Sequence, residues 1–218
     1  MAAEITISPV WLVRWEEMDM EDTSTSTTTP EWHHIVPEIH NVVATIQIEC
    51  DPIDIQRLSV LMPYSTYDKA KFAAITIRLL DPTCTCLLFT SGKLVVTGAS
   101  SWEEALLTAH HICDILRELH PGQQFRIIGY EVQNIVAHVE LPLSEGQTME
   151  LDAFYRDHCE ECTYQRSMFP GLIYRPLRAS VVLLCFSSAK IVITGGKSVD
   201  QIFSEWEKLR PVVMRYVR

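Results

Sequence analysis

The sequence has no long apolar run. No stretch approaches the roughly 18 consecutive apolar residues of a membrane-spanning helix. The N-terminal residues also lack the basic region and apolar stretch of a secretory signal. We therefore expect a soluble, intracellular protein with no membrane partner.

The seven cysteines are an odd number, so they cannot all form disulfides. They are spread through apolar or helical patterns, which is typical of reduced thiols in a cytosolic or nuclear protein. Cys159 and Cys162 form a C-x-x-C motif after His158, but no second cysteine pair accompanies them. Because a single C-x-x-C is weak evidence for zinc, we predict no metal and no cofactor.

Motifs for catalysis are missing as well. The chain has neither a phosphate-binding glycine loop nor the nucleophile elbow of a hydrolase. We therefore predict no catalytic residues and no enzymatic activity.

Positive charge is scarce. The 218 residues contain 28 acidic and 18 basic residues, so the net charge is −10 and the pI is near 5.2. Taken as a whole, this charge argues against a nucleic-acid-binding protein with a broad basic surface. The apolar fraction of 47% is enough for a proper hydrophobic core.

Residues 1–34 form an acidic N-terminal tail. Seven acids and one arginine give this tail a net charge of −6, and residues 23–30 are a Ser/Thr tract that ends in proline. Such a tract predicts a flexible linker. Upstream, residues 10–22 mix tryptophans with acids, which is typical of a segment that folds on a partner or packs back on its own domain.

An internal repeat organises the rest of the chain. Residues 72–101 and 169–198 align without gaps at an offset of 97, with 11 identities in 30 positions. Residues 40–46 also match residues 133–139, at an offset of 93. Two related units are therefore predicted, over 35–127 and 128–218.

Each unit contains the same elements in the same order. β-Branched runs predict strands in both units, over 41–48, 72–80, 84–89, 93–97, 134–141, 171–177, 181–186 and 190–194. Capping signals at Ser101 and Ser198 predict a long helix in each unit, the second bent at Pro211, and shorter helices are expected over 52–61 and 151–160. We predict an α+β fold in which helices cover one face of an antiparallel sheet.

The second face of this sheet is unusual. In residues 93–97 and 190–194 the two-residue period places apolar side chains on both faces. A face that carries Val, Phe and Thr either packs on a partner, as in a sandwich or tight dimer, or binds something flat and apolar.

The distribution of charge favours the second alternative. Residues 68–98 have four bases and two acids, and residues 165–197 have five bases and no acid. The strand segments thus carry net charges of +2 and +5 within an acidic protein. Cations around an apolar face suit a polyanion with an apolar interior, such as bent DNA.

The sequence resembles the TATA-box-binding protein family over essentially all of residues 35–218. The motifs that carry the resemblance are Ile35-Val-Pro37, Asn41-Val-Val43, Lys71-Phe-Ala-Ala74, Phe89-Thr-Ser-Gly-Lys93, Val96-Thr-Gly-Ala99, Gln133-Asn-Ile-Val136, Phe169-Pro-Gly-Leu-Ile-Tyr-Arg175 and Ile193-Thr-Gly195. The family implies a saddle of two pseudo-symmetric repeats. Its curved antiparallel sheet lies in the minor groove of TATA-like DNA, and its helices on the convex face meet other transcription factors.

The resemblance also assigns roles to individual positions. The DNA-intercalating residues would be Phe72, Phe89, Phe169 and Phe186. The minor-groove contacts would be Asn41, Val43, Val95, Thr97, Asn134, Val136, Val192 and Thr194. The phosphate contacts would be Lys71, Arg78, Lys93, Arg175, Arg178 and Lys190.

Three departures from the family pattern concern its contacts. Thr83 and Ser180 stand where the family usually has arginine, which removes candidate phosphate contacts. The long helix of the first repeat is not basic as in the family, and the loop 164–168 lacks the acids that meet transcription factor IIB. These changes put in doubt some of the family's protein partners.

Two functions follow from the resemblance. The first is a nuclear general transcription initiation factor that binds and kinks A·T-rich promoter DNA and assembles with factor IIA-like and IIB-like proteins and TBP-associated factors. The second is an adapter that binds proteins but has weak or no sequence-specific DNA binding. A homodimer through the saddle in the absence of DNA and competition between the acidic tail and DNA are further hypotheses.

Overall fold

The computed structural model describes residues 35–218, and the expectations for the acidic tail over 1–34 lie outside the described residues. The strands are β1 (Glu38–Glu49), β2 (Ser65–Thr66), β3 (Ala74–Arg78), β4 (Thr85–Phe89), β5 (Lys93–Ala99), β6 (Arg126–Glu140), β7 (Cys162–Thr163), β8 (Leu172–Tyr174), β9 (Val182–Cys185) and β10 (Lys190–Gly196). The helices are α1 (Ile55–Leu61), α2 (Trp102–Leu119), α3 (Leu151–Asp157), α4 (Val199–Val213) and the 3-10 turn η2 (Met214–Tyr216).

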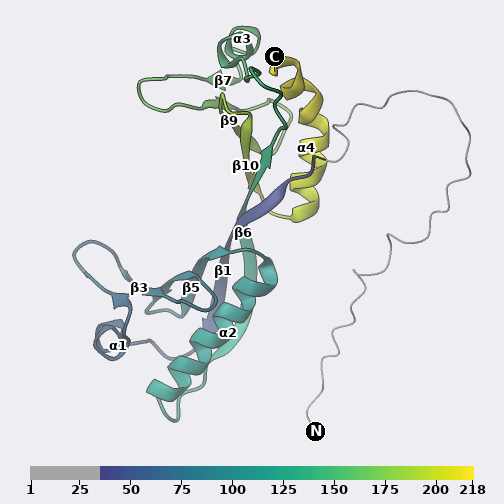
Figure 1. The fold of residues 1–218 in the computed structure, drawn as a ribbon. Helices are drawn as coiled ribbons and strands as arrows, with labels where there is room; N and C mark the ends of the chain where they lie inside the picture. Colours follow the sequence, from purple (N-terminus) through teal and green to yellow (C-terminus); the bar gives the residue numbers. More distant parts are fainter. Residues whose placement is uncertain (1–34) are drawn as a thin grey trace, which may run out of the picture. The chain divides into compact units, whose positions relative to one another are not determined.

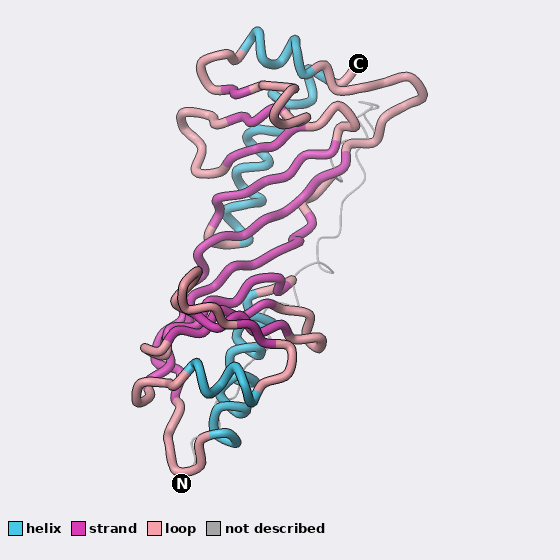
Figure 2. Tube along the Cα trace, turned by 90° about the vertical axis from the view of Figure 1, so that its left-hand side faces the viewer, coloured by secondary structure: helices cyan, strands magenta, loops and turns pink. Residues whose placement is uncertain are grey.

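All ten strands belong to one antiparallel sheet, in the order β2-β3-β4-β5-β1-β6-β10-β9-β8-β7. Figure 2 shows the strands as one continuous band. The second repeat follows the first in mirrored order around the central pair β1 and β6. In this pair Asn41 lies opposite Val136 and Val43 lies opposite Asn134, which is the reciprocal pairing that a pseudo-twofold axis produces.

The fold confirms the predicted α+β class, with two repeats and helices covering the convex face of a curved sheet. Helix α2 packs on β5, β1 and β6, and α4 packs on β10 and β6 (Figure 1). The buried faces of these helices meet the alternate strand residues, such as Leu94 and Val96 in β5, which are fully buried. Burial of these aliphatic side chains is the main favourable contribution to folding.

Both long helices begin at the predicted serine caps. The Ser101 hydroxyl accepts a hydrogen bond from the Glu104 backbone N–H at 3.1 Å, and Ser198 accepts one from Gln201 at 3.2 Å. The Glu104 carboxylate in turn accepts bonds from the hydroxyl and backbone N–H of Ser100, which hold the pKa of Glu104 below its usual value.

Several element boundaries differ from the expectation. The strands expected over 72–80 and 171–177 span only 74–78 and 172–174, because the residues on both sides of each strand form loops and turns. The helix expected over 151–160 ends at Asp157, and α4 continues past Pro211 to Val213. Strand β6 starts eight residues earlier than expected, and these residues pair with β1.

No helix among residues 35–218 is long and apolar enough to cross a membrane.

Candidate nucleic-acid interface

The face of the sheet opposite α2 and α4 is formed by the strand residues that alternate with the buried core. Because residues paired across antiparallel strands point to the same face, the register identifies its members. Val43, Val95, Val136 and Val192 lie on this open face and are half-buried. The structure thus brings the four predicted valines together on one surface.

Two residues that sequence reasoning missed complete this apolar floor. Leu87 pairs with Val95, and Leu184 pairs with Val192. Both leucines are half-buried, unlike their buried neighbours in β4 and β9. Alternation within 84–89 could have placed Leu87 on the open face with Phe89.

Asn41 and Asn134 occupy equivalent places at the centre of the open face. The side-chain oxygen of Asn41 accepts a hydrogen bond from the Gly98 backbone N–H at 2.7 Å, and that of Asn134 accepts one from Gly195 at 2.8 Å. These bonds set the orientation of each amide, because its oxygen faces the glycine. The amide nitrogen of each asparagine therefore carries the donors near the open face, and at Asn134 one of them is used by Thr194.

Threonine hydroxyls lie beside both asparagines. Thr97 Oγ1 is 3.5 Å from the Asn41 oxygen, and Asn134 Nδ2 donates to Thr194 Oγ1 at 3.1 Å. The backbone turns sharply after each threonine, where Gly98 and Gly195 have φ of 97° and 100°. Only glycine adopts this conformation without strain, so each Thr-Gly dipeptide places a hydroxyl and an N–H next to an asparagine.

A hollow of about 610 Å³ extends from the Asn41 and Thr97 side chains to Arg78. Its lining includes Asn41, Thr97, Thr85 and Arg78. Two predicted minor-groove residues of the first repeat, Asn41 and Thr97, and the predicted phosphate contact Arg78 therefore line one hollow.

The four predicted phenylalanines form two pairs, one in each repeat. The ring centroids of Phe72 and Phe89 are 5.8 Å apart with an interplanar angle of 66°, and those of Phe169 and Phe186 are 5.6 Å apart at 68°. All four rings are partly accessible, with Phe72 at 48% exposure. Large aromatic rings in this position are not part of the core, which is consistent with insertion into a ligand.

Gly171 makes room for the pair of the second repeat. A Cβ atom at this position would lie 2.7 Å from Cε1 of Phe169 and 3.0 Å from Cε1 of Phe186. The equivalent residue of the first repeat is the buried Ala74. The two phenylalanine pairs therefore have similar ring geometry, although the neighbouring strand residue is glycine in the second repeat and alanine in the first.

The predicted phosphate contacts are exposed, but not all are unpaired. Within residues 35–218, Arg78, Lys93, Arg175 and Arg178 form no ion pair. Lys71 lies 3.3 Å from Asp68, and Lys190 lies 3.1 Å from Glu140.

The two positions that lack the family's arginine are engaged locally. The Thr83 hydroxyl donates to the Leu80 carbonyl at 3.0 Å, and the Ser180 hydroxyl accepts a hydrogen bond from Gln201 at 2.7 Å. Neither side chain can replace the long reach of a guanidinium group.

His138 is a third open-face residue that sequence reasoning missed. It pairs with Val192 across β6 and β10, and its Nε2 lies 3.4 Å from a Glu38 carboxylate oxygen. The pseudo-symmetric residue of the first repeat is Thr45. Only the pairing of β1 with β6 reveals the contact, since Glu38 and His138 are 100 residues apart.

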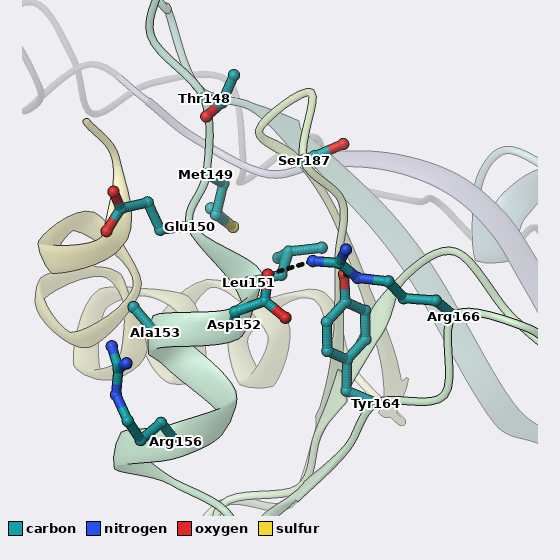
Figure 3. A pocket seen from close by; sticks show the side chains of 10 residues that line it. All are labelled: Thr148, Met149, Glu150, Leu151, Asp152, Ala153, Arg156, Tyr164, Arg166 and Ser187. Atoms are coloured by element: carbon teal, nitrogen blue, oxygen red, sulfur yellow. Dashed lines mark hydrogen bonds and ion pairs between the residues drawn. The ribbon is translucent and has the colours of Figure 1, made fainter.

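A separate pocket of about 470 Å³ lies beside α3 (Figure 3). Arg166 extends across it, forms an ion pair with Asp152 and donates from Nε to the Tyr164 hydroxyl at 2.8 Å. The loop 164–168 that the sequence marks as divergent is thus held against α3 by a cation.

The C-x-x-C motif does not extend to a ligand set. Cys159 is exposed, whereas burial raises the pKa of the Cys162 thiol to about 12. His158 packs on Phe154 and Tyr216 and lies 3.5 Å from Glu161. Residues 35–218 contain no group of three or more His, Cys, Asp or Glu side chains arranged for a metal ion.

Comparison with known proteins assigns the chain to a family. The family described as "Transcription factor TFIID (or TATA-binding protein, TBP)" matches residues 36–119 and 129–216, one segment in each repeat. The chain belongs to the TATA-binding protein family. The resemblance inferred from the paired motifs is therefore confirmed. This is a family of transcription factors rather than enzymes, in agreement with the prediction of no enzymatic activity.

Relatives within the TATA-binding protein family share about a third of their residues with this chain. TATA-box-binding protein 1 of Triticum aestivum is 35% identical over 182 residues, which are 84% of this chain and 75% of the relative. The Drosophila melanogaster TATA-box-binding protein is 32% identical over 182 residues, and the chain spans only half (50%) of its length. Proteins named TATA box-binding protein-like 2 match at similar identity.

A solved structure of Methanococcus jannaschii TBP has the same fold. It matches with a TM-score of 0.70 and 31% identity, and the match covers 83% of this chain and 99% of that chain. The continuous sheet and its helices are therefore those of the TATA-binding protein family.

Proposed function

We propose that this protein is a general transcription initiation factor that binds the minor groove of TATA-like, A·T-rich promoter DNA. In this proposal the open face lies against the DNA, the phenylalanine pairs insert into base steps at two sites, and the helices on the other face meet protein partners. The observation that carries it is the duplication of one surface: a phenylalanine pair and an Asn-Thr-Gly cluster occur twice in pseudo-symmetric positions.

The chemistry of this surface suits the minor groove. Adenine N3 and thymine O2 are acceptors there, and the oriented amides of Asn41 and Asn134 offer donors to them. The apolar valines can lie against a groove floor that lacks amino groups, whereas the guanine amino group would intrude on them. We propose that these residues, with Thr97 and Thr194, favour A·T pairs.

The phenylalanines would supply the distortion. An apolar ring that enters a base step partly unstacks it and bends the duplex, which lets more protein surface reach the DNA. Phe72 with Phe89 would act at one end of the site, and Phe169 with Phe186 at the other.

The exposed cations would hold the backbone. Arg78, Lys93, Arg175 and Arg178 would neutralise phosphates directly, and Lys71 and Lys190 would do so after leaving their carboxylates. Phosphate contacts set affinity and orientation but read no sequence.

The proposed partners and location follow from the family. Factor IIA-like and IIB-like proteins and TBP-associated factors would dock outside the open face, in the nucleus. Helix α2 presents His110, His111, Asp114 and Glu118 to solvent, with Arg117 its only basic residue. A partner that recognises a basic helix would therefore bind this chain poorly.

A binding series tests the function. The full chain should shift a TATA duplex in a gel, and replacing central A·T pairs by G·C pairs should weaken binding. The single substitutions Phe89→Ala and Phe186→Ala should each weaken binding to the TATA duplex. Equal affinity for both duplexes, with no effect of either substitution, would disprove the proposal.

A second candidate is an adapter that works through protein contacts. The observation that favours it is the reduced supply of free cations: Lys190 is held by Glu140, and Thr83 and Ser180 replace arginines of the family pattern. An adapter would recruit its protein partners even when Phe89 and Phe186 are both replaced by alanine. Recruitment that requires the phenylalanines and DNA would exclude it.

A further inference from the structure

Each phenylalanine of the open face has a cation close to it in the chain. Lys69 and Arg166 each precede a phenylalanine by three residues, in the loops that lead to Phe72 and Phe169. Lys93 and Lys190 follow Phe89 and Phe186 across the hairpin turns from β4 to β5 and from β9 to β10. We call these four side chains the rim cations.

The two rim cations of the second repeat are both held by carboxylates. Lys190 Nζ lies 3.1 Å from Glu140 Oε1, and Arg166 forms an ion pair with Asp152. The side chains of both ion pairs, cations and carboxylates alike, are substantially exposed, with side-chain exposures between 46% and 73%. Such exposed pairs contribute little to folding stability, so exchanging the carboxylate for another anion costs the fold little.

The two rim cations of the first repeat, Lys69 and Lys93, have no such partner in residues 35–218. The carboxylate next to Lys69, that of Asp68, pairs instead with Lys71 at 3.3 Å. Across β1 and β5, Lys93 lies opposite Gln47, at the position where the second repeat pairs Lys190 with Glu140 across β6 and β10. The Gln47 amide donates at 3.1 Å to two backbone carbonyls, those of Ile48 and Ser91. A neutral glutamine therefore stands in place of the glutamate.

The same exchange occurs at the other rim position. Equivalent hydrogen bonds, Leu58 N–H to the Asp54 carbonyl and Phe154 N–H to the Glu150 carbonyl, align α1 with α3. This alignment places Gln56 in the position of Asp152. A second equivalent pair, Phe72 N–H to the Asp68 carbonyl and Phe169 N–H to the Gln165 carbonyl, places Lys69 in the position of Arg166. At both rim positions the first repeat has an amide where the second has a carboxylate.

We propose that Glu140 and Asp152 occupy the rim cations of the second repeat in place of DNA phosphates, so that the two halves of the open face bind DNA unequally. This inference rests on the proposed DNA-binding function. The first repeat then releases counterions when its rim lysines meet phosphates, whereas the second must first exchange a carboxylate for a phosphate. The carboxylates that remain near the rim also repel the phosphates of the incoming strand.

A charge-exchange cycle tests this asymmetry, with affinity for a fixed TATA duplex measured at several salt concentrations. Lys93→Met should weaken binding roughly threefold to tenfold and reduce the slope of log K against log salt by about one. Lys190→Met should change affinity and slope much less. In the Glu140→Gln background, however, Lys190→Met should cost as much as Lys93→Met does in the unmodified chain.

The reverse exchange gives a matched control. Glu140→Gln alone should tighten binding and steepen the salt slope, and Gln47→Glu should weaken binding and make Lys93→Met nearly silent. Glu207→Gln, on α4, removes one negative charge beside Arg210 away from the open face and should leave the affinity unchanged. Thermal unfolding of each variant separates these effects from a loss of folded protein.

The outcomes separate the inference from the function on which it rests. Equal costs of Lys93→Met and Lys190→Met in the unmodified chain, or no effect of Glu140→Gln, would overturn the asymmetry while DNA binding stands. A full chain that binds no duplex at any salt concentration would overturn both.

Discussion

The two faces of the sheet are built from the same strands but differ in what covers them. Along β5, the side chains of Leu94 and Val96 are fully buried under α2, whereas Val95 and Thr97 between them are only half-buried. The second repeat repeats this pattern in β10. Apolar side chains thus serve stability on one face and remain available to a ligand on the other, and substitutions on the two faces should separate the two roles.

The largest expected effect comes from the open face. Replacing Phe89 and Phe186 together by alanine should lower affinity for a TATA duplex at least about 30-fold, since contacts between aromatic rings and bases are worth about 1–3 kcal/mol each. Both rings are partly exposed, so the melting temperature should change little. Fluorescence anisotropy and thermal unfolding measure the two quantities; a large loss of stability with unchanged affinity would reverse the assignment of the faces.

Leu88, the residue next to Phe89, should affect stability rather than DNA affinity. Leu88 is fully buried on the helix-covered face, and Leu88→Ala should lower the free energy of unfolding by about 2–5 kcal/mol through lost burial and a cavity. The fraction of protein that stays folded should bind DNA with unchanged affinity. Chemical denaturation measures the first effect, and binding at low temperature the second. A specific loss of affinity in fully folded protein would contradict the separation of the faces.

A smaller effect is expected from the central asparagines. Asn41→Ala or Asn134→Ala should reduce the preference for A·T over G·C pairs by about 1–3 kcal/mol, because each removes an oriented donor. The bond that Gly98 or Gly195 donates to the asparagine oxygen is also lost, so Asn→Asp, which keeps the acceptor but removes the donor, is the matched control. If Asn→Asp retains the A·T preference, the amide N–H groups do not read the bases.

The smallest effect is expected from chemical labelling of the cysteines on the helix-covered side of the sheet. Cys84, Cys86, Cys113 and Cys185 are buried, and burial raises the pKa of Cys86 to about 12 and that of Cys113 to about 11. A raised thiol pKa leaves almost no reactive thiolate at pH 8, and reactivity should grow only as the pH approaches these values or the fold opens. A thiol reagent at pH 8 should therefore modify the exposed Cys159 first and these four only in denaturant. Rapid labelling of Cys86 in the native protein would show that this face is open.

Much of this architecture could be predicted from the sequence, because it depends on local patterns. The two-residue alternation of β5 and β10 and the serine caps of α2 and α4 reflect interactions within short segments, and the repeat at an offset of 97 residues shows each local pattern twice. The family resemblance added the roles of the phenylalanines, asparagines and threonines. Those roles stay predictions, although the structure does place the residues together on one face.

The remaining features depend on pairing between distant segments. Nothing in the composition of residues 126–133 shows that they extend β6 along β1 and join the repeats. The contacts of Glu38 with His138 and of Glu140 with Lys190 likewise arise only when β1, β6 and β10 lie side by side. A count of charges along the sequence therefore treats Lys190 and Arg166 as free cations, although the structure pairs both with carboxylates.

The central claim is that the open face binds duplex DNA and bends it. The most direct test is energy transfer between dyes at the two ends of a short TATA duplex, titrated with the full chain. We predict that transfer rises on binding, that a G·C-substituted duplex shows little change, and that Phe89→Ala with Phe186→Ala removes the rise even at protein concentrations that saturate binding. Binding without any increase in transfer, or an equal increase with the double variant, would contradict the claim.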